Sequence, residues 1–504
     1  MLNLNQDQSQ NSAQNQTLTD QVKALAEKHF ERVRQLRRTI HQNPELSFSE
    51  SSTSKLVAKE LQELGYTVKT GIGGTGLTAE LAPVEAKKNA KEKTATTAVI
   101  GIRADMDALP IQEENPVAYC SNHKGVMHAC GHDAHTACGL GAAMILADLH
   151  QSGLAGNLPT KVRFLFQPAE ECTNDSGKSG ATLMMEDGAL EGLSALVGLH
   201  VFPSIPTGMI GLKEGPLLAA CDTFDIKITG KGCHGAYPQD GIDAIVLAAQ
   251  AVQAIQTITS RRKSALNPCV ITLGGLRSTT YAPNIVAEAV ELTGTVRYFD
   301  PQMSTLTRTE LERALGVVRA LGGDFELKYK HENPPLINDP TMTEAVRQAA
   351  SKLAGREQIL EPGLQLGAED FSFYCQHTKA CFLVLGAMIE GDIRTLHTPS
   401  FDIDEEALKL GSAILALSTL EFYRTTDLLP QGQGGRPAAT SGQGTNPLTI
   451  TLFPISCQHN TTAPPANYRG FRLASGENRQ SKQPTTSCKP CRGKAALYLG
   501  RHSR

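Results

Sequence analysis

The fold is decided by residues 97–107, which read Thr-Ala-Val-Ile-Gly-Ile-Arg-Ala-Asp-Met-Asp. The first half is a short, continuous apolar run, as expected of a strand that is buried on both faces of a parallel sheet. The acidic half begins where that strand would end. Because ligands of such sheets gather at the carboxyl ends of the strands, this stretch predicts a covered α/β sheet and the edge at which its site lies.

Three further apolar runs end in acidic or histidine residues in the same way. They are Val162–Phe166 before Gln167–Glu171, Leu196–Leu199 before His200, and Cys381–Gly386 before a loop that holds His397. Parallel strands end at a common edge, so segments far apart in the chain can meet in one crevice. We therefore expect an α/β fold with a mostly parallel sheet that helices cover on both faces.

A thiol and an imidazole stand two residues apart at Cys130-Gly131-His132. In an extended segment such residues project to the same side, and Gly131 leaves room for both to converge on one ion. Thiolate and imidazole suit zinc and similar borderline ions. An isolated Cys-x-His is more often a buried cysteine beside a helix-capping histidine. This one lies among strand ends rich in further ligand types.

Five motifs follow one another along the chain. They are Arg103–Pro110, His128–Asp133, Phe166–Glu171, Gly198–His200 and Gly367–Phe371. In content and order they resemble the M20 metallopeptidase family, and most closely its aminoacylase, hippurate hydrolase and indole-acetyl-amino-acid hydrolase branch. The similarity covers about residues 30–425. It implies a zinc-peptidase-like catalytic domain with a two-metal site. The ligands that the resemblance implies are Cys130, His132, Glu171, His200 and His397.

Glu170 is the general acid/base that the resemblance implies, and the chemistry of the turn agrees. Adjacent glutamates on a turn point in different directions, so Glu171 could bind a metal ion while Glu170 carries a proton from water to the leaving amine. A lone Glu-Glu pair is usually a solvated turn, but Pro168 fixes its approach from the strand. Of the divalent ions, zinc is favoured, with manganese, nickel and cobalt as alternatives.

Residues beside these motifs have supporting roles. Asp107 is expected to accept a hydrogen bond from a ligand imidazole, and Asp105 stands where other branches of the family have a histidine ligand. Two roles stay open for Asp133, which could cap the helix expected at residues 134–149 or support a ligand. His128 and His135 are expected to pack or form hydrogen bonds rather than bind metal.

The composition frames these motifs. The chain has 504 residues, 40% of them hydrophobic, with a net charge of -3. This length suits two domains, and the charge predicts no nucleic-acid partner. No apolar run approaches the roughly 18 residues of a membrane span, so we expect no membrane partner. The Gln/Asn-rich start is unlike a secretion signal, and the scattered cysteines, with Cys130 reduced, favour the cytoplasm.

The expected elements divide the chain into four parts. Residues 1–17 are a polar extension, and the metal-binding domain is discontinuous, comprising 18–220 and 333–426. It opens with an amphipathic helix at Thr19–His41. Between its two parts, residues 221–332 have the strand and helix order βαββαβ of a ferredoxin-like unit. We interpret this unit as a lid through which a homo-oligomer could also form.

Two segments are expected to lie outside the packed domains. Residues 85–96 are rich in Lys and Ala and form a solvated insertion. Residues 427–504 are rich in Gly, Pro, Gln, Thr and Ser, a composition that predicts no packed core. The lone Cys-x-x-Cys at Cys488–Cys491 has no second pair at zinc-ribbon spacing, so it is not interpreted as a metal site.

Three residues of the expected lid match the substrate site of the resembled family. His234 corresponds to a histidine that donates to the developing oxyanion, and Asn284 and Arg297 correspond to substrate-contacting residues. Without the resemblance, we would interpret these residues as a surface histidine, an asparagine in a turn before a strand and an arginine on an edge. Arg suits a substrate carboxylate because its guanidinium binds bidentately. Features that bear on substrate preference are Cys233, Gln239 and the stretch 172–180.

These observations predict a metal-dependent amidohydrolase. Its small-molecule substrate would be an N-acyl or N-aroyl amino acid, cleaved to a carboxylic acid and a free amino acid. One alternative is a thiol hydrolase in which Cys130 forms an acyl-enzyme. Another is a non-catalytic, metal-dependent binder of acyl amino acids, although the presence of Glu170 and His234 argues against it.

Overall fold

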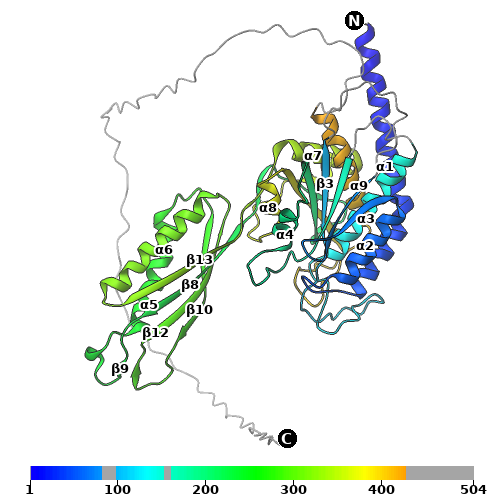
Figure 1. Cartoon of the computed structure of the whole chain (residues 1–504). Coiled ribbons are helices and arrows are strands. Elements are labelled where there is room, and N and C mark those ends of the chain that lie inside the picture. Colours follow the sequence, from blue (N-terminus) through cyan, green and yellow to red (C-terminus); the bar gives the residue numbers. More distant parts are fainter. Residues whose placement is uncertain (1, 82–97, 153–160, 427–504) are drawn as a thin grey trace, which may run out of the picture. The chain divides into compact units, whose positions relative to one another are not determined.

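The computed structural model describes residues 2–81, 98–152 and 161–426 (Figure 1). The expectations for residues 85–96 and 427–504, including Cys488–Cys491, lie outside these described residues. Within them the chain forms a large eight-stranded sheet and, inserted in its sequence, a four-stranded sheet. We call residues 220–333 the inserted domain and the remainder the large-sheet domain.

The large sheet has the strand order β1-β2-β4-β3-β5-β16-β6-β15. The strands are β1 Tyr66–Ile72, β2 Gly76–Leu81, β3 Val99–Asp105, β4 Lys161–Gln167, β5 Leu193–Pro206, β6 Ile210–Gly211, β15 Ile359–Leu360 and β16 Lys379–Met388. The central pairs β3 with β4, β3 with β5, and β5 with β16 are parallel. The pairs β1 with β2 and β2 with β4 are antiparallel. The predicted mostly parallel sheet is confirmed, with antiparallel strands at its edge.

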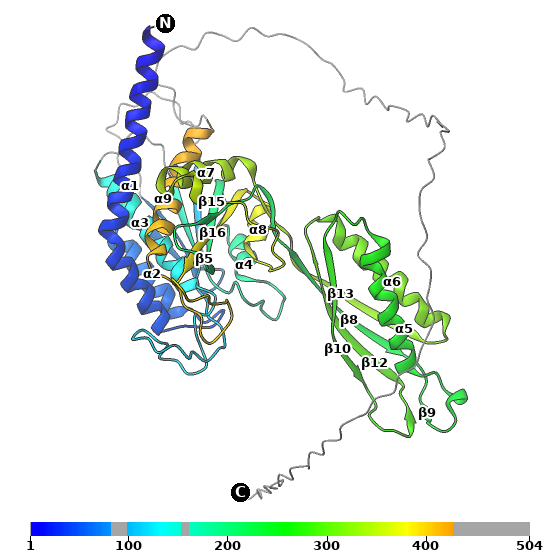
Figure 2. The same cartoon turned by 180° about the vertical axis from the view of Figure 1, so that it is seen from behind.

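Helices cover both faces of this sheet (Figures 1 and 2). One core unites the strands with α1 Leu2–Gln42, α2 Ser51–Glu63, α3 His132–Gln151, α7 Pro340–Ala354 and α9 Ala407–Thr425. On the other face lie α4 Gly180–Glu186 and α8 Phe371–Cys375. The side chains of β4 alternate between the two faces of the sheet. Phe164 and Phe166 belong to the first core, and Leu165 belongs to the second. The helix expected at Thr19–His41 is confirmed and begins earlier, at Leu2.

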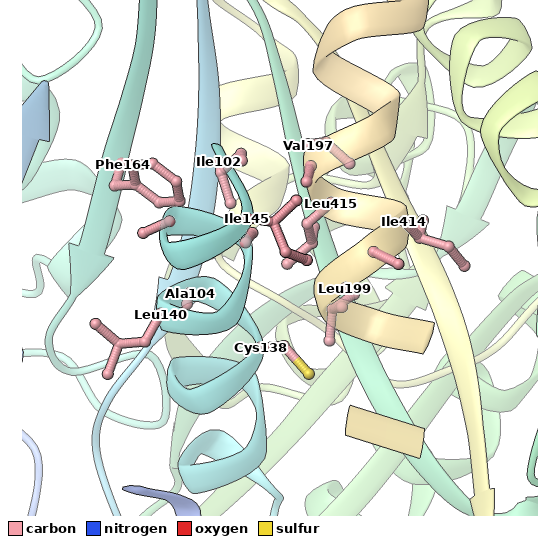
Figure 3. Close-up of a cluster of buried hydrophobic side chains, with 14 of the residues drawn as sticks. Ile102, Ala104, Cys138, Leu140, Ile145, Phe164, Val197, Leu199, Ile414 and Leu415 are labelled. Atoms are coloured by element: carbon pink, nitrogen blue, oxygen red, sulfur yellow. The ribbon is translucent and has the colours of Figure 1, made fainter. Parts of the chain in front are cut away.

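The core beneath the site is formed by α3, α9 and the central strands (Figure 3). Ile102 and Val197 of the sheet gather with Ile145 of α3 and Leu415 of α9, and all four side chains are buried. Gly141 permits close approach of the helices, since a Cβ there would lie 2.2 Å from Oγ of Ser412 on α9. Close packing on all sides holds α3, whose N-terminus carries the Cys-Gly-His motif, in one position.

The inserted domain has the predicted βαββαβ order. Its elements are β8 Ala220–Thr229, α5 Ala244–Thr257, β10 Cys269–Ser278, β12 Ala289–Tyr298, α6 Gln302–Ala320 and β13 Asp324–Asn333. The strands are antiparallel in the order β10-β12-β8-β13, and α5 and α6 share one core with the sheet. Two short strands, β9 Cys233–His234 and β11 Ile285–Val286, form a separate pair. The ferredoxin-like prediction is thus confirmed.

The short remaining elements are β7 Gly215–Leu218, which pairs with β14 Leu336–Asn338, and three helical turns at Pro238–Asp240, Ile258–Arg262 and Arg356–Gln358. Strands β7 and β14 lie just before and just after the inserted domain in the sequence. Among the described residues, no helix is both long enough and apolar enough to cross a bilayer.

Candidate metal centre

The Cys130-Gly131-His132 turn lies against strand β5. Gly131 has a φ of 93°, a left-handed conformation that favours glycine. A Cβ at Gly131 would also lie 2.4 Å from Cγ2 of Val201. Glycine therefore allows both the turn and its close approach to the strand. The expectation of an extended segment here was wrong, because Gly131 is left-handed and His132 begins helix α3.

Cys130 lies between two histidines from distant parts of the chain. Its Sγ is 3.3 Å from Nε2 of His200 and 3.3 Å from Nε2 of His397. Nε2 of His397 is in turn 3.2 Å from Oε1 of Glu171. The backbone fixes this loop as well, because the amide of His397 donates to the carbonyl of Ala129 at 2.8 Å. The structure thus brings four of the five predicted ligands together around the thiol.

His132, the fifth predicted ligand, is oriented by Asp107. Its Nδ1 donates to the carbonyl oxygen of Asp107 at 2.9 Å and lies 3.1 Å from Oδ1 of the same residue. This leaves Nε2 facing the cluster, 3.9 Å from Oε2 of Glu170 and from Oε1 of Glu171. Oδ2 of Asp107 also accepts from the amide of Glu171 at 3.1 Å. One buried aspartate therefore positions two candidate ligands, the arrangement expected behind a metal-bound histidine.

His200 corrects one sequence prediction. The strand was expected to stop before His200, but β5 continues to Pro206, and His200 pairs with Val384 of β16. The prediction of this strand end was wrong because β5 has two neighbours of different extent. Strand β16 pairs with β5 as far as Pro206, well beyond the last residue of β5 that pairs with β3. The neighbouring β3 pairs with β5 only as far as Arg103 with Gly198 and ends at Asp105. His200 therefore still lies near the carboxyl end of the central sheet.

The donor atoms fit a pair of divalent cations. Nε2 of His132 is buried and has no hydrogen-bond partner among the described residues, while Oε1 of Glu171 is buried with Nε2 of His397 at 3.2 Å. A buried polar atom without a partner costs about 1–3 kcal/mol, and a cation would satisfy Nε2 of His132. Thiol, imidazole and carboxylate atoms form overlapping groups within 4.8 Å, of which one contains Cys130, His132 and His200 and another Cys130, Glu171 and His397. Such mixed donors suit zinc.

A strained turn precedes Glu170 and Glu171, whose carboxylates both approach Nε2 of His132, each at 3.9 Å. The expectation that these adjacent glutamates point in different directions was therefore wrong, because carboxylate atoms of both lie within 4.8 Å of one another. Ala169 has a φ of 46°, which is unfavourable for a residue with a Cβ. Its amide donates to the buried carboxylate of Glu50 at 2.8 Å, and its carbonyl accepts from the amide of Gly180 at 2.9 Å. These bonds hold the strained conformation in place, and it precedes the predicted proton carrier directly.

Glu170 lies among carboxylates that one buried arginine balances. Carboxylate oxygens of Glu170, Glu369 and Asp370 lie within 4.8 Å of one another. Arg103 donates to Glu369 at 2.8 Å and to Asp370 at 2.9 Å. Burial, followed by repulsion from Glu369, raises the pKa of Glu170 well above its usual value. The Gly367–Phe371 motif, to which the sequence assigned no role, thus surrounds the predicted proton carrier.

The two histidines excluded from the ligand set are placed differently. His135 forms hydrogen bonds, as expected, with Nδ1 at 2.7 Å from Oδ1 of Asp105 and Nε2 accepting from the amide of Val201 at 3.0 Å. Both of its nitrogens are therefore occupied. His128 is buried, and neither of its ring nitrogens has a partner in the part of the chain that the structure describes.

Asp133 neither caps α3 nor bonds directly to a proposed ligand. Helix α3 begins at His132, and its N-cap is Gly131, with no side-chain cap. Asp133 instead accepts from Nε of Arg37 at 2.7 Å, and its Oδ2 lies 2.7 Å from Nδ1 of His41. The cap was wrong because a buried guanidinium is a stronger partner for a buried carboxylate than backbone amides, and the partners of Asp133 are Arg37 and His41 rather than a proposed ligand.

The three predicted substrate residues lie in the inserted domain, and two of them are neighbours. His234 pairs with Ile285, and the amide of Gly235 donates to the carbonyl of Asn284 at 2.7 Å. Arg297 pairs with Cys221 at the beginning of β8, whereas His234 follows the end of that strand. Arg297 thus lies at the opposite end of the inserted sheet. His234 and Asn284 are exposed, and Arg297 is half-buried.

Sequence reasoning missed the buried charges that support the centre. The most informative are Arg37, Glu50 and Arg103, all buried. Arg37 follows Val33 by four residues and precedes Ile40 by three, so it lies on the apolar stripe of its helix. A charge on that stripe was a readable signal, because charged side chains are rarely buried without a partner.

The fold and this buried donor cluster define the class of metal-dependent hydrolases with an inserted βαββαβ domain. The chain belongs to peptidase family M20/M25/M40, whose model matches residues 101–421. It is therefore an enzyme of the M20 amidohydrolase type, and the resemblance suggested by the motifs is confirmed.

Individual relatives are similar over most of their length. The N-acetyl-L-cysteine deacetylase of Bacillus subtilis is 40% identical over 385 residues, which cover 75% of this chain and 85% of the relative. The IAA-amino acid hydrolase ILR1-like 4 of Arabidopsis thaliana is 34% identical over 388 residues, 76% of this chain and 83% of the relative. A solved Bacillus subtilis structure, described as a dinuclear metal-binding peptidase of the M20 family, is 33% identical with a TM-score of 0.65 and covers 78% of this chain and 98% of its own.

Proposed function

We propose that this chain hydrolyses the amide bond of N-acyl amino acids, releasing a carboxylic acid and a free amino acid. The observation that carries the proposal is the carboxylate of Glu170 within 3.9 Å of the candidate ligand His132. A proton carrier beside a metal centre is the arrangement that amide hydrolysis needs. Relatives named as an acetylcysteine deacetylase and an IAA-amino acid hydrolase support acetyl and indole-acetyl substrates. Benzoyl amino acids are the third candidate.

The proposed cofactor is a pair of divalent cations, with zinc favoured over manganese, nickel and cobalt. The proposed ligands are Cys130, His132, Glu171, His200 and His397. When bound, such cations would acidify water and polarise the substrate carbonyl. Asp107 orients the imidazole of His132, and Glu170 takes a proton from the attacking water and delivers it to the leaving nitrogen.

We propose that His234 donates to the oxyanion that forms on the substrate carbonyl. Its Nδ1 accepts from the amide of Ala236 at 3.1 Å, so in the neutral ring the proton is on Nε2, which is free to donate. Arg297 would bind the substrate carboxylate through its guanidinium, and Asn284, beside His234, would contact the substrate.

A thiol hydrolase remains the main alternative, since Cys130 has two histidines within hydrogen-bonding distance of its sulfur. Burial raises the pKa of the Cys130 thiol well above its usual range, whereas a nucleophilic cysteine needs a lowered pKa. A binder without catalysis would not need a proton carrier at the position of Glu170. Both considerations favour the metal hydrolase.

The experiment is a hydrolysis screen of acetyl, benzoyl and indole-acetyl amino acids with metal-depleted and metal-reloaded protein. We expect turnover of at least one series only after reloading with zinc, manganese, nickel or cobalt. Turnover that survives complete chelation would indicate the thiol hydrolase. Binding of these compounds without turnover, with every metal, would indicate the binder.

We also propose a reducing, cytoplasmic location and a homo-oligomer formed through the inserted domain. The described cysteines are all free, and Cys130 must be reduced to bind metal. Strand β10 is at the edge of its sheet and exposes Val270 and Leu276, 40% and 58% accessible, and unpaired edges are sites of association. Light scattering of the wild type and of Leu276→Lys tests the oligomer, which the variant should dissociate.

A further inference from the structure

Arg37 of α1 is enclosed by carboxylates from two distant segments. Its guanidinium lies 2.7 Å from Asp133, 2.9 Å from Asp402 and 3.3 Å from Glu405, and its side chain is 0% exposed. Helix α1 precedes residues 101–421, the part that matches the family model. The three carboxylates raise the pKa of Arg37 although burial alone would lower it. The charge is therefore retained inside the protein.

This arginine connects the two segments that carry the candidate ligands. Asp133 follows His132 directly, and Asp402 lies shortly after His397 in the sequence. Asp402 is further fixed by the hydroxyl of Tyr119, which donates to its Oδ2 at 2.8 Å. The ion pairs of Arg37 thus join the first turn of α3 to the loop that holds His397.

The loop of His397 is joined to the Cys130 turn by the bond from the amide of His397 to the carbonyl of Ala129, and further bonds hold its end. His397 has a φ of 58°, and its side chain is 51% exposed. Asn115 donates to the carbonyl of Phe401 at 2.7 Å, and Arg394 donates to Asn115 at 2.7 Å. These bonds hold the end of the loop but do not involve α3, whereas the guanidinium of Arg37 contacts both Asp402 and Asp133 of α3.

We propose that Arg37 is a positioning residue that fixes the spacing between the Cys130-Gly131-His132 turn and His397 and thereby sets the metal affinity of the centre. The inference rests on the proposed function only in that these residues bind divalent cations. A planar guanidinium can bind several carboxylates at fixed angles, which the single ammonium of lysine cannot. Loss of a partner that orients metal ligands typically lowers metal affinity about 10–100-fold.

Arg38 offers a matched control on the same helix. Its guanidinium binds Glu405 at 2.5 Å and lies 4.6 Å from the ring of Tyr119, but its side chain is 41% exposed. The guanidinium of Arg37 lies 4.9 Å from the same ring, so Arg37 and Arg38 share one carboxylate and one aromatic neighbour. They differ in the contacts of Arg37 with Asp133 and Asp402. Both variants replace an arginine of α1 by lysine. Only Arg37→Lys disrupts the proposed connection between Asp133 and Asp402, and Arg38→Lys leaves it intact.

The experiment titrates the metal-depleted full chain with Co²⁺ and, by chelator competition, with Zn²⁺. We expect Arg37→Lys to bind both ions about 10–100-fold more weakly than the wild type, and Arg38→Lys to bind them as the wild type does. The charge-transfer band of cobalt bound to the Cys130 thiolate should appear in Arg37→Lys only at correspondingly higher cobalt concentration. A purely structural role would lower the melting temperature of the metal-free protein and leave these affinities unchanged.

Equal affinities of the two lysine variants would overturn the inference. If Arg37→Lys does not fold, Tyr119→Phe decides, because it removes one bond to Asp402 and no charge. Weaker cobalt binding by that variant supports the connection, and wild-type binding overturns it. If the wild type binds neither ion, the proposed function itself is overturned. If the wild type binds and Arg37→Lys binds equally well, only the role of Arg37 is overturned.

Discussion

The large-sheet domain and the inserted domain hold their proposed functional residues in different ways. In the large-sheet domain Cys130 and His132 are buried, and buried arginines pair with nearby carboxylates, Arg37 with Asp133 and Arg103 with Glu369. In the inserted domain His234 is exposed and is oriented by one local bond from Ala236. The first domain therefore preorganises the proposed ligands, and the second presents side chains that solvent can reach.

The inserted domain has its own buried carboxylate, but not beside His234. Asp222 accepts hydrogen bonds from the hydroxyls of Ser304 and Tyr329, each at 2.7 Å, and of Tyr298 at 3.1 Å. Asp222 is the third residue of β8, whereas His234 follows the end of that strand. Buried charge thus stabilises the fold of this domain, while in the large-sheet domain it supports the metal site. Substitutions in the two domains should therefore have different effects. Those in the large-sheet domain should change metal affinity or turnover, and those in the inserted domain should change turnover or stability.

The largest effect is expected for Glu170→Gln. The amide cannot carry the proton between water and leaving nitrogen, so turnover should fall about 10²–10⁴-fold, while metal content stays near that of the wild type. Steady-state kinetics together with metal analysis measure both quantities. The control is Glu171→Gln, which should lose metal. Wild-type turnover in Glu170→Gln would remove Glu170 from the reaction.

The next effect concerns His234→Ala in the inserted domain. Because the proposed hydrogen bond forms mainly in the transition state, kcat should fall about 10²–10³-fold with little change in KM. Metal content should be unchanged, since His234 is not a proposed ligand. His331→Ala, which removes another solvent-accessible histidine of the same domain, is the control for turnover. Because Nδ1 of His331 lies 3.2 Å from Oδ1 of Asp222, this variant should lower stability without changing kcat. A rise in KM alone would make His234 a substrate-affinity residue.

A smaller effect is expected for Asp107→Asn in the large-sheet domain. The variant keeps the shape of the side chain but weakens the hold on His132 and on the amide of Glu171, so metal affinity should fall about 10–100-fold. Competition with a chromophoric chelator measures it. Ser47→Ala, which removes only one hydrogen bond to Asp107, should change the affinity less. Unchanged metal affinity in Asp107→Asn would show that the carboxylate of Asp107 is not needed to orient His132 and Glu171.

The sequence predicted those parts of the molecule that depend on local pattern. Strand ends and the Cys130-Gly131-His132 spacing indicated where ligands meet, and alternation with helix periodicity indicated the βαββαβ unit. The extent of β5 was missed because the pairing of His200 with Val384 is a property of the sheet, not of either segment. The partners of Asp133 were missed for the same reason, since Arg37 is remote in sequence and close only in the folded core.

The smallest functional effect is expected for Asp222→Asn. Its carboxylate receives three hydroxyl donors within the inserted domain, and bonds to a charged acceptor each contribute about 1.5–3 kcal/mol. The variant should therefore unfold at lower temperature than the wild type, in both the metal-free and the metal-loaded form. Metal affinity should remain that of the wild type, because the proposed ligands all lie in the large-sheet domain. Thermal unfolding and cobalt titration of the same preparation give the two values. Weaker cobalt binding by Asp222→Asn would mean that the inserted domain contributes to the metal centre, and the division between the two domains would then be wrong.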